Sequence, residues 1–135
     1  MRVKRLSKFT KRKIFAPEIW KESHVEGQTV EQVWFAGVHS NIGGGYRRSG
    51  LSDISLKWMI DKAKSAGLYF WDNYEDRVLM SPDPKGKIYN PREKLGVIYF
   101  KAVRKIPENS QIHETVFQRI KDEYSLYKPK NIPSS

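Results

Sequence analysis

A short apolar stretch that runs into a histidine and three consecutive glycines constrains this chain more than any other feature (residues 33–46, VWFAGVHSNIGGGY). Residues 30–36 are mostly β-branched or aromatic, which predicts a buried strand bounded by turn-forming residues. Residues 37–50 are predicted to form a loop, because glycine adopts backbone angles that other residues avoid. A strand that ends in a histidine-bearing loop is typical of the edge where α/β proteins bind their ligands.

The most regular helical pattern covers residues 52–66. Ser52 is predicted to be its N-cap, Asp53 suits the first turn, and Gly67 is a natural terminator. Apolar residues recur at helical spacing and predict one buried face, formed by Ile54, Leu56, Trp58, Met59, Ile60 and Ala63. The order is therefore strand, loop and helix.

The rest of the chain adds few strands. Residues 68–94 are predicted to be irregular, because prolines and glycines interrupt them. Residues 96–103 are predicted to form a second strand, residues 110–124 a short helix, and residues 125–135 an extended tail. The fold class is therefore α/β, and the small number of strands predicts one partial domain over residues 1–135 rather than a complete doubly wound sheet.

The net charge of +10, from 25 basic and 15 acidic residues, favours anionic partners such as nucleic acid or a phospholipid surface. Residues 1–13 form a basic N-terminal segment that contains no acid. A targeting or nucleic-acid-binding arm is less favoured, because matches on basic runs are often false positives. A solvated basic strand or helix face, or the exposed edge of a truncated domain, is favoured instead.

Composition also excludes several kinds of site. The chain has no cysteine, which excludes disulfides, thiol nucleophiles and cysteine-bound metals. His24, His39 and His113 are far apart in the sequence, so no metal site and no cofactor are expected. No apolar run approaches the roughly 20 residues that span a bilayer.

His39 is the residue best suited to catalysis. Histidine titrates near neutral pH, and in serine hydrolases it acts as the general base that activates a serine hydroxyl. From the residues alone, a histidine that only hydrogen-bonds the glycine loop is an equally weighted alternative. The chain lacks the Gly-x-Ser-x-Gly elbow of such enzymes, and Ser40 does not have the required glycine spacing.

A run of glycines before a helix has a second interpretation. Backbone N–H groups of Gly43, Gly44 and Gly45 are placed to bind phosphate, and Arg47 and Arg48 would add positive charge. Neither the Walker pattern nor the dinucleotide-binding fingerprint is present. A flexible turn that shapes a pocket wall is therefore favoured.

Several segments taken together resemble a known family. They are residues 15–20 (FAPEIW), 32–46 (QVWFAGVHSNIGGGY), 51–59 (LSDISLKWM), 112–119 (IHETVFQR) and 127–133 (YKPKNIP). They are similar to the late conserved block and C-terminal end of an α/β-hydrolase family that was long labelled a domain of unknown function. That family includes the phospholipase effectors of type VI secretion systems.

The resemblance implies the incomplete C-terminal part of an α/β-hydrolase sheet, from a serine esterase or phospholipase with a Ser-Asp-His triad. By motif position His39 is the catalytic histidine. Ser40 and the glycines Gly43, Gly44 and Gly45 then belong to the pocket or the oxyanion side. The elbow serine of the family, and its acid, have no counterpart in this chain.

Two further residues receive supporting roles. The family usually has an acid where this chain has Asn41, so Asn41 is expected to support the loop or the histidine without a charge. Asp53 is expected chiefly to stabilise the start of its helix, with support of the histidine as the lesser alternative.

We therefore expect a C-terminal hydrolase fragment that is inactive alone. The family resemblance implies phospholipid or another ester as the substrate of the complete enzyme. The alternatives are a basic, non-enzymatic binding module for anionic membrane or nucleic acid, and a structural protein that pairs with an upstream hydrolase half. Specific nucleic-acid recognition is not expected. The expected location is the cytoplasm, or outside the cell after secretion without a signal peptide.

Overall fold

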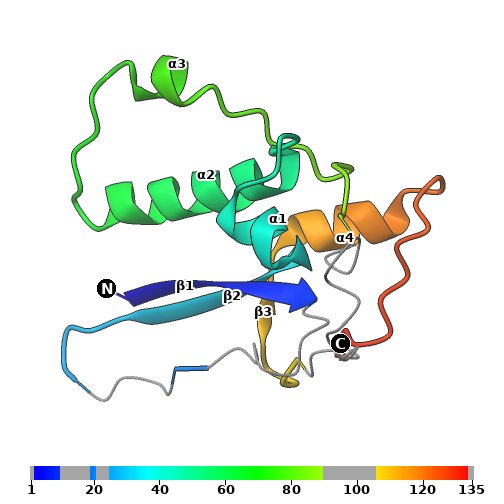
Figure 1. Ribbon diagram of the computed structural model, residues 1–135. Coiled ribbons are helices and arrows are strands. Elements are labelled where there is room, and N and C mark those ends of the chain that lie inside the picture. Colours follow the sequence, from blue (N-terminus) through cyan, green and yellow to red (C-terminus); the bar gives the residue numbers. More distant parts are fainter. Residues whose placement is uncertain (1, 10–18, 21–24, 90–105, 134–135) are drawn as a thin grey trace.

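The computed structural model of the chain describes residues 2–9, 19–20, 25–89 and 106–133. Their helices and strands are β1 (Arg2–Phe9), β2 (Val30–Val38), α1 (His39–Gly43), α2 (Gly50–Ser65), α3 (Tyr74–Val78), β3 (Gln111–Ile112) and α4 (Glu114–Lys121). In Figure 1, α1 and α2 lie over one face of the sheet, and α4 follows directly from β3. This is a small α/β arrangement, as the pattern of the sequence predicts.

The sheet is parallel, in the order β1-β2-β3. β1 runs along most of β2, with Arg2 opposite Val30 and Leu6 opposite Trp34. The short β3 pairs with the middle of β2, where Ile112 also lies opposite Trp34. Because the strands are parallel, their carboxyl ends point toward the same edge, and in open α/β folds ligands bind at that edge.

The basic N-terminal segment supplies the outer strand of this sheet. Arg2–Phe9 form a strand whose backbone pairs with β2. The strand predicted over residues 96–103 lies outside the described residues.

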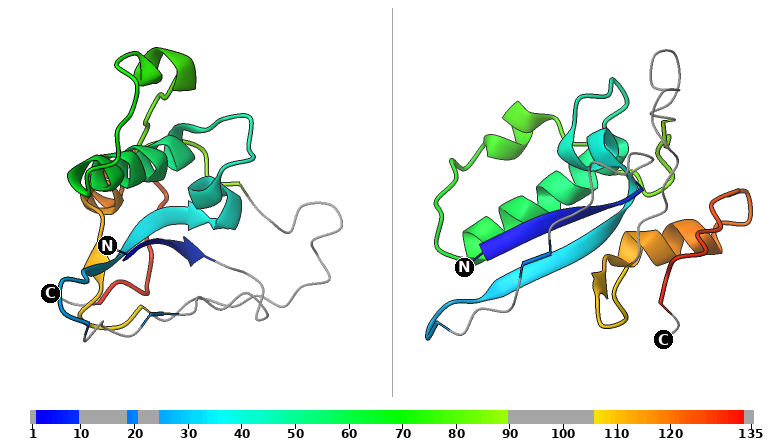
Figure 2. Two further views of the ribbon diagram at one scale, coloured as in Figure 1. Left: turned by 90° about the vertical axis from the view of Figure 1, so that its left-hand side faces the viewer. Right: turned by 60° about the horizontal axis from the view of Figure 1, so that its bottom comes forward.

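A cluster of buried side chains joins β2 to the two helices above it: Val33, Phe35, Ile42, Leu51 and Ile54. Successive strand residues point to opposite faces, so Val33 and Phe35 share the face that α1 and α2 cover. Both views in Figure 2 show α2 along that face and α3 standing away from the sheet. Burial of such side chains stabilises the fold by roughly 1.5–3 kcal/mol each, and this cluster therefore attaches α2 to the sheet.

The predicted loop over residues 37–50 contains regular structure. Strand β2 continues to Val38, and the helical turn α1 follows at once. Helix α2 begins at Gly50, slightly before the predicted start. The prediction of Ser52 as N-cap is wrong: Ser49 holds that position, and the Ser52 hydroxyl donates to the Ser49 carbonyl from within the first turn.

The end of α2 agrees with the prediction. Ala66 is the C-cap, and Gly67 follows with a φ of +86°, a conformation that favours glycine. The Gly67 N–H donates to the Lys64 carbonyl, and the Leu68 N–H donates to the Ala63 carbonyl. This pair of bonds is the Schellman motif, which satisfies carbonyls that the helix leaves without partners.

The helix predicted over residues 110–124 is too long, because its first residues join the sheet as β3 and only α4 is helical. His113 makes the transition between the two. Its backbone N–H donates to the Trp34 carbonyl at 2.9 Å, and its Nδ1 accepts the N–H of Thr115. Residues 68–89 are irregular as predicted, apart from the short helix α3.

Gly37 allows β2 to end as it does. Its φ is +122°, and the register with β1 shifts between Ser7 and Phe9, so that β2 carries one extra residue there. Such a bulge bends a strand and redirects the side chains that follow. A Cβ atom at Gly37 would lie 2.5 Å from the Cβ of Asn41, so α1 packs directly on bare backbone.

We expect Gly37→Ala to lower the free energy of unfolding by roughly 2–4 kcal/mol, because overpacking adds to backbone strain. Gly27→Ala is the matched control, since Gly27 also has a positive φ but its Cβ would meet no atom within 4 Å. Urea unfolding of both variants separates packing from strain. An equal loss in the two variants would contradict the close approach of Asn41.

Candidate functional site

The structure places His39 at the carboxyl end of β2, as the first residue of α1. The residue is exposed, whereas Val38 immediately before it is only 4% exposed. The histidine is therefore an exposed residue at the carboxyl edge of a parallel sheet. Its catalytic role stays a prediction.

Asn41 lies two residues later and is buried, with 2% exposure. Its Oδ1 accepts the N–H of Val38 at 3.2 Å, and its Nδ2 donates to the carbonyl of Lys87 at 3.1 Å. A carboxylate only accepts hydrogen bonds, so an amide is needed to make both contacts. Asn41 thus fastens the turn after β2 to a distant segment, through backbone groups rather than through His39.

Ser40 and Gly43 belong to α1, and Gly44 ends it by donating its N–H to the Ser40 carbonyl at 3.1 Å. Gly44 and Gly45 have φ values of +93° and +102°, which favour glycine. A Cβ at any of the three glycines would meet no atom within 4 Å. Backbone conformation, rather than close packing, therefore accounts for Gly44 and Gly45, and their part in a pocket stays a prediction.

Asp53 secures the start of α2. Its Oδ2 accepts the Ser49 hydroxyl at 2.8 Å and the Ser81 N–H at 3.0 Å, and the residue is 7% exposed. A carboxylate in the first turn also complements the positive end of the helix dipole. These contacts lead to the segment near Ser81, and none of them leads to His39.

Ser55 joins α1 to α2, a role for which the sequence interpretation had no signal. The residue is fully buried, and its hydroxyl lies 2.7 Å from the carbonyl of Ile42 and 2.9 Å from that of Ser52. A serine within a helix commonly bonds its own preceding turn, so the contact with Ile42 depends on how the two helices pack.

His113, which the sequence interpretation also left without a role, follows β3. Its ring stacks on Phe35 with centroids 4.7 Å apart, and its Nδ1 lies 2.9 Å from the Thr115 hydroxyl. Burial lowers the pKa of His113, and the opposing effect of Glu114 is smaller. Phe35 lies three residues before the end of β2, roughly 10 Å along the strand. His113 therefore caps α4 well away from the strand end that holds His39.

A cavity of about 560 Å³ opens beside Val38, the residue directly before His39. Its walls come from residues 85–89 and from residues 119–127, which the sequence alone did not bring together. The C-terminal part of the chain thus returns to the same edge of the sheet as the candidate histidine.

A second cavity, of about 480 Å³, lies at the start of α2. Arg48, Lys85 and Lys87 line it together with the acid Asp83. Arg48, one of the two cations that follow the glycine run, therefore faces the segment 81–87. Two lysines that the sequence interpretation did not consider, Lys85 and Lys87, add positive charge to the same cavity.

Within the described residues, no cluster of three or more His, Cys, Asp or Glu side chains is arranged to hold a metal ion. Within the same residues, no helix combines the length and the apolar character needed to cross a bilayer.

We expect Asn41→Asp to destabilise the fold at neutral pH by about 2 kcal/mol or more, because it buries a charge and sets a carboxylate oxygen against the Lys87 carbonyl. Asn73→Asp is the matched control, because Asn73 is exposed. Thermal unfolding of both variants measures the difference. Equal stabilities would contradict the amide contacts of Asn41.

We also expect His113 to contribute to the loss of stability in acid. Its pKa is lowered in the folded chain, so protonation favours the unfolded state, and the loss begins as the pH falls below the ordinary histidine value of about 6.5. His113→Asn keeps a capping side chain and should lose less free energy of unfolding between about pH 7.5 and about pH 5. His39→Asn serves as the control, and an unchanged pH dependence in His113→Asn would contradict the effect.

Comparison with known proteins adds one finding. Residues 5–62 match the family model described as the T6SS phospholipase effector Tle1-like catalytic domain, which is less than half of the 135-residue chain. The matched region contains β2, α1 and most of α2, and therefore includes His39 and Asn41. Comparisons with curated proteins and with solved structures give no significant match. Over residues 5–62, the chain is therefore similar to the Tle1-like catalytic domain of type VI secretion phospholipase effectors.

Proposed function

We propose that this chain is the C-terminal part of a serine hydrolase of the phospholipase-effector type, with phospholipid or a related ester as substrate. The position of His39 carries the proposal. It follows a buried strand of a parallel sheet, stands exposed at the carboxyl edge, and lies inside the region that matches the family.

In this mechanism His39 acts as the general base. Its imidazole takes the proton of a serine hydroxyl as that oxygen attacks the ester carbonyl, and returns the proton to the leaving alcohol. The turn at Gly43, Gly44 and Gly45 lies beside the histidine and would border the pocket or the oxyanion, together with Ser40. Asn41 and Asp53 support the site indirectly, by holding the backbone on either side of this turn.

The nucleophile comes from another polypeptide segment in this proposal. No Gly-x-Ser-x-Gly elbow occurs in the sequence, and only such an elbow presents the serine of an α/β-hydrolase at the top of its sheet. The small parallel sheet would then be one part of a larger hydrolase sheet, and the chain by itself would be catalytically silent.

The test is hydrolysis of a fluorogenic phospholipid and of a short-chain nitrophenyl ester. The purified chain alone should give no turnover above background. Together with the polypeptide encoded directly upstream it should hydrolyse the substrate, and His39→Ala should then lower kcat by about 100-fold or more.

His113→Asn is the matched control, and its kcat in the same mixture should stay within a few-fold of the unsubstituted chain. Loss of activity in His113→Asn but not in His39→Ala would move the general base to His113. Turnover by the chain alone that His39→Ala abolishes would show that the nucleophile lies within these residues. No hydrolysis by the mixture would contradict the proposal.

A net charge of +10 favours one second candidate, a basic module that binds anionic membrane without chemistry. Salt screens the attraction between a basic protein and anionic lipid. Retention on phosphatidylserine vesicles should therefore fall strongly as the salt concentration rises. Co-sedimentation at low and high salt tests this directly. Binding that is absent or insensitive to salt would eliminate this candidate.

A further inference from the structure

The cavity beside Val38 combines two kinds of lining. Most of the side chains are apolar or aromatic, and three charged ones interrupt them: Arg119, Lys85 and Asp122. The apolar and aromatic members are Val38, Ile88, Tyr89, Tyr124, Leu126 and Tyr127. Its volume of about 560 Å³ falls within the range of small-molecule sites, about 300–1,000 Å³.

Arg119 is the charged residue that sets this cavity apart, because it is only 9% exposed. Its Nη1 donates to the carbonyls of Pro84 and Gly86, at 2.6 and 2.7 Å. Its Nε is buried without a hydrogen-bond partner, and no bond of its Nη2 is found among the described residues. Backbone carbonyls therefore fix Nη1 of the guanidinium, while Nε and Nη2 have no acceptor among the described residues.

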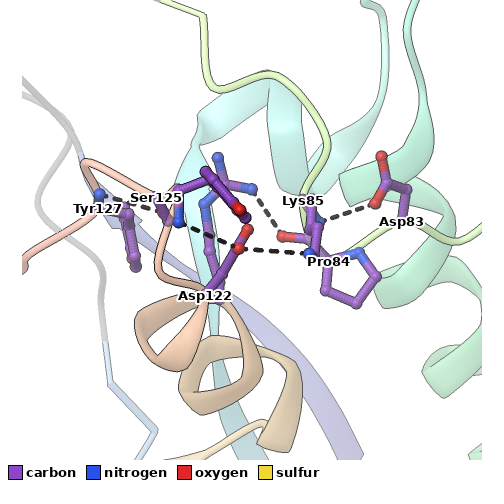
Figure 3. A network of polar contacts seen from close by, with 8 residues as sticks. Asp83, Pro84, Lys85, Asp122, Ser125 and Tyr127 are labelled. Carbon is purple, nitrogen blue, oxygen red and sulfur yellow. Dashed lines mark hydrogen bonds and ion pairs between the residues drawn. The ribbon is translucent and has the colours of Figure 1, made fainter.

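No carboxylate forms an ion pair with Arg119 among the described residues. Asp122 lies in the same cavity but is 3.3 Å from the Lys85 ammonium, and Asp83 accepts the backbone N–H of Lys85 at 2.8 Å. Figure 3 shows this chain of contacts from Asp83 through Lys85 to Asp122. Asp122 thus pairs with the Lys85 ammonium, whereas Asp83 contacts the Lys85 backbone and does not line the cavity. Two cations and one acid are therefore found among the described lining residues, which leaves one cation in excess.

A buried guanidinium without a counter-ion is costly, since desolvation disfavours the charged form. Burial indeed lowers the pKa of Arg119, against the smaller opposing effects of Tyr127, Asp83 and Asp122. The guanidinium carbon lies 5.2 Å from the centroid of the Tyr127 ring, so the π-electrons of the ring also stabilise the charge. A ligand oxygen that carries negative charge would supply what the described residues do not.

We propose that this cavity binds the carboxylate of a fatty acid, with Arg119 holding the head group, Val38 and Ile88 lining the path of the alkyl chain, and Leu126 at the open mouth. A carboxylate oxygen can accept a charge-assisted bond from Nη2 of Arg119, because Nη1 is already engaged by two carbonyls, and the remaining walls favour an unbranched apolar chain. Binding of this kind needs no nucleophile, so it stands independently of the proposed hydrolase activity.

The test is titration of the purified chain with dodecanoate, below the concentration at which it forms micelles, followed by calorimetry. Dodecanoate should bind at a saturable site. Dodecanol has the chain without the charge, and acetate has the charge without the chain, so both should bind at least tenfold more weakly. Equal binding of dodecanol and dodecanoate would overturn the role of Arg119, and absence of saturable dodecanoate binding would overturn the site.

Arg119→Met should weaken dodecanoate binding by about tenfold or more, because it removes the charge-assisted bond. Since Arg119 also holds the carbonyls of Pro84 and Gly86, a second variant avoids dependence on that contact. Leu126→Asp places a carboxylate at the mouth of the cavity, and the Leu126 side chain is 99% exposed, so folding should be unaffected.

Leu79→Asp is the matched control for Leu126→Asp. Leu79 is also exposed, at 83%, and does not line the cavity. Dodecanoate binding should fall about tenfold in Leu126→Asp and remain unchanged in Leu79→Asp. Equal binding by the two variants would place the ligand elsewhere and contradict the proposal, whatever the hydrolysis assay shows.

Discussion

The packing of Asn41 on the bare backbone of Gly37 fixes the path of the chain as it leaves β2. A side chain at Gly37 would occupy the space of Asn41, so the helical turn α1 would be displaced from the strand. Asn41 in turn satisfies the Val38 N–H and the Lys87 carbonyl, and buried groups of this kind are costly when left without partners. The positions of His39, of α2 and of the segment near Lys87 all depend on this contact.

The same turn separates two environments at the carboxyl edge of the sheet. Outward, His39 is accessible to whatever approaches that edge. Inward, Asn41, Asp53 and Ser55 use their polar atoms to hold backbone in place. The sequence interpretation assigned roles to His39, Asn41 and Asp53, and of these three only His39 is exposed. The hydrogen bonds of Asn41 and Asp53 fix the backbone on either side of the turn that follows β2.

Local pattern was sufficient for the long elements. The β-branched and aromatic residues before His39 predicted β2, and helical spacing with Asp53 and Gly67 predicted α2 nearly to its ends. Local pattern failed where two neighbouring residues offered the same chemistry, as with Ser49 and Ser52 at the helix start. It also failed for β3, since a strand of two residues has no period and forms only because β2 offers its backbone groups.

The sequence by itself determined the α/β class, the strand that leads to His39, and the similarity of residues 5–62 to a phospholipase-effector catalytic domain. These features depend on the periodicity and the motifs of short segments, and such patterns can be recognised in the sequence. Only the tertiary structure decided that Arg119 is buried beside Val38 without an ion-pair partner among the described residues. Burial and charge balance depend on which distant segments pack together, and no local spacing encodes that.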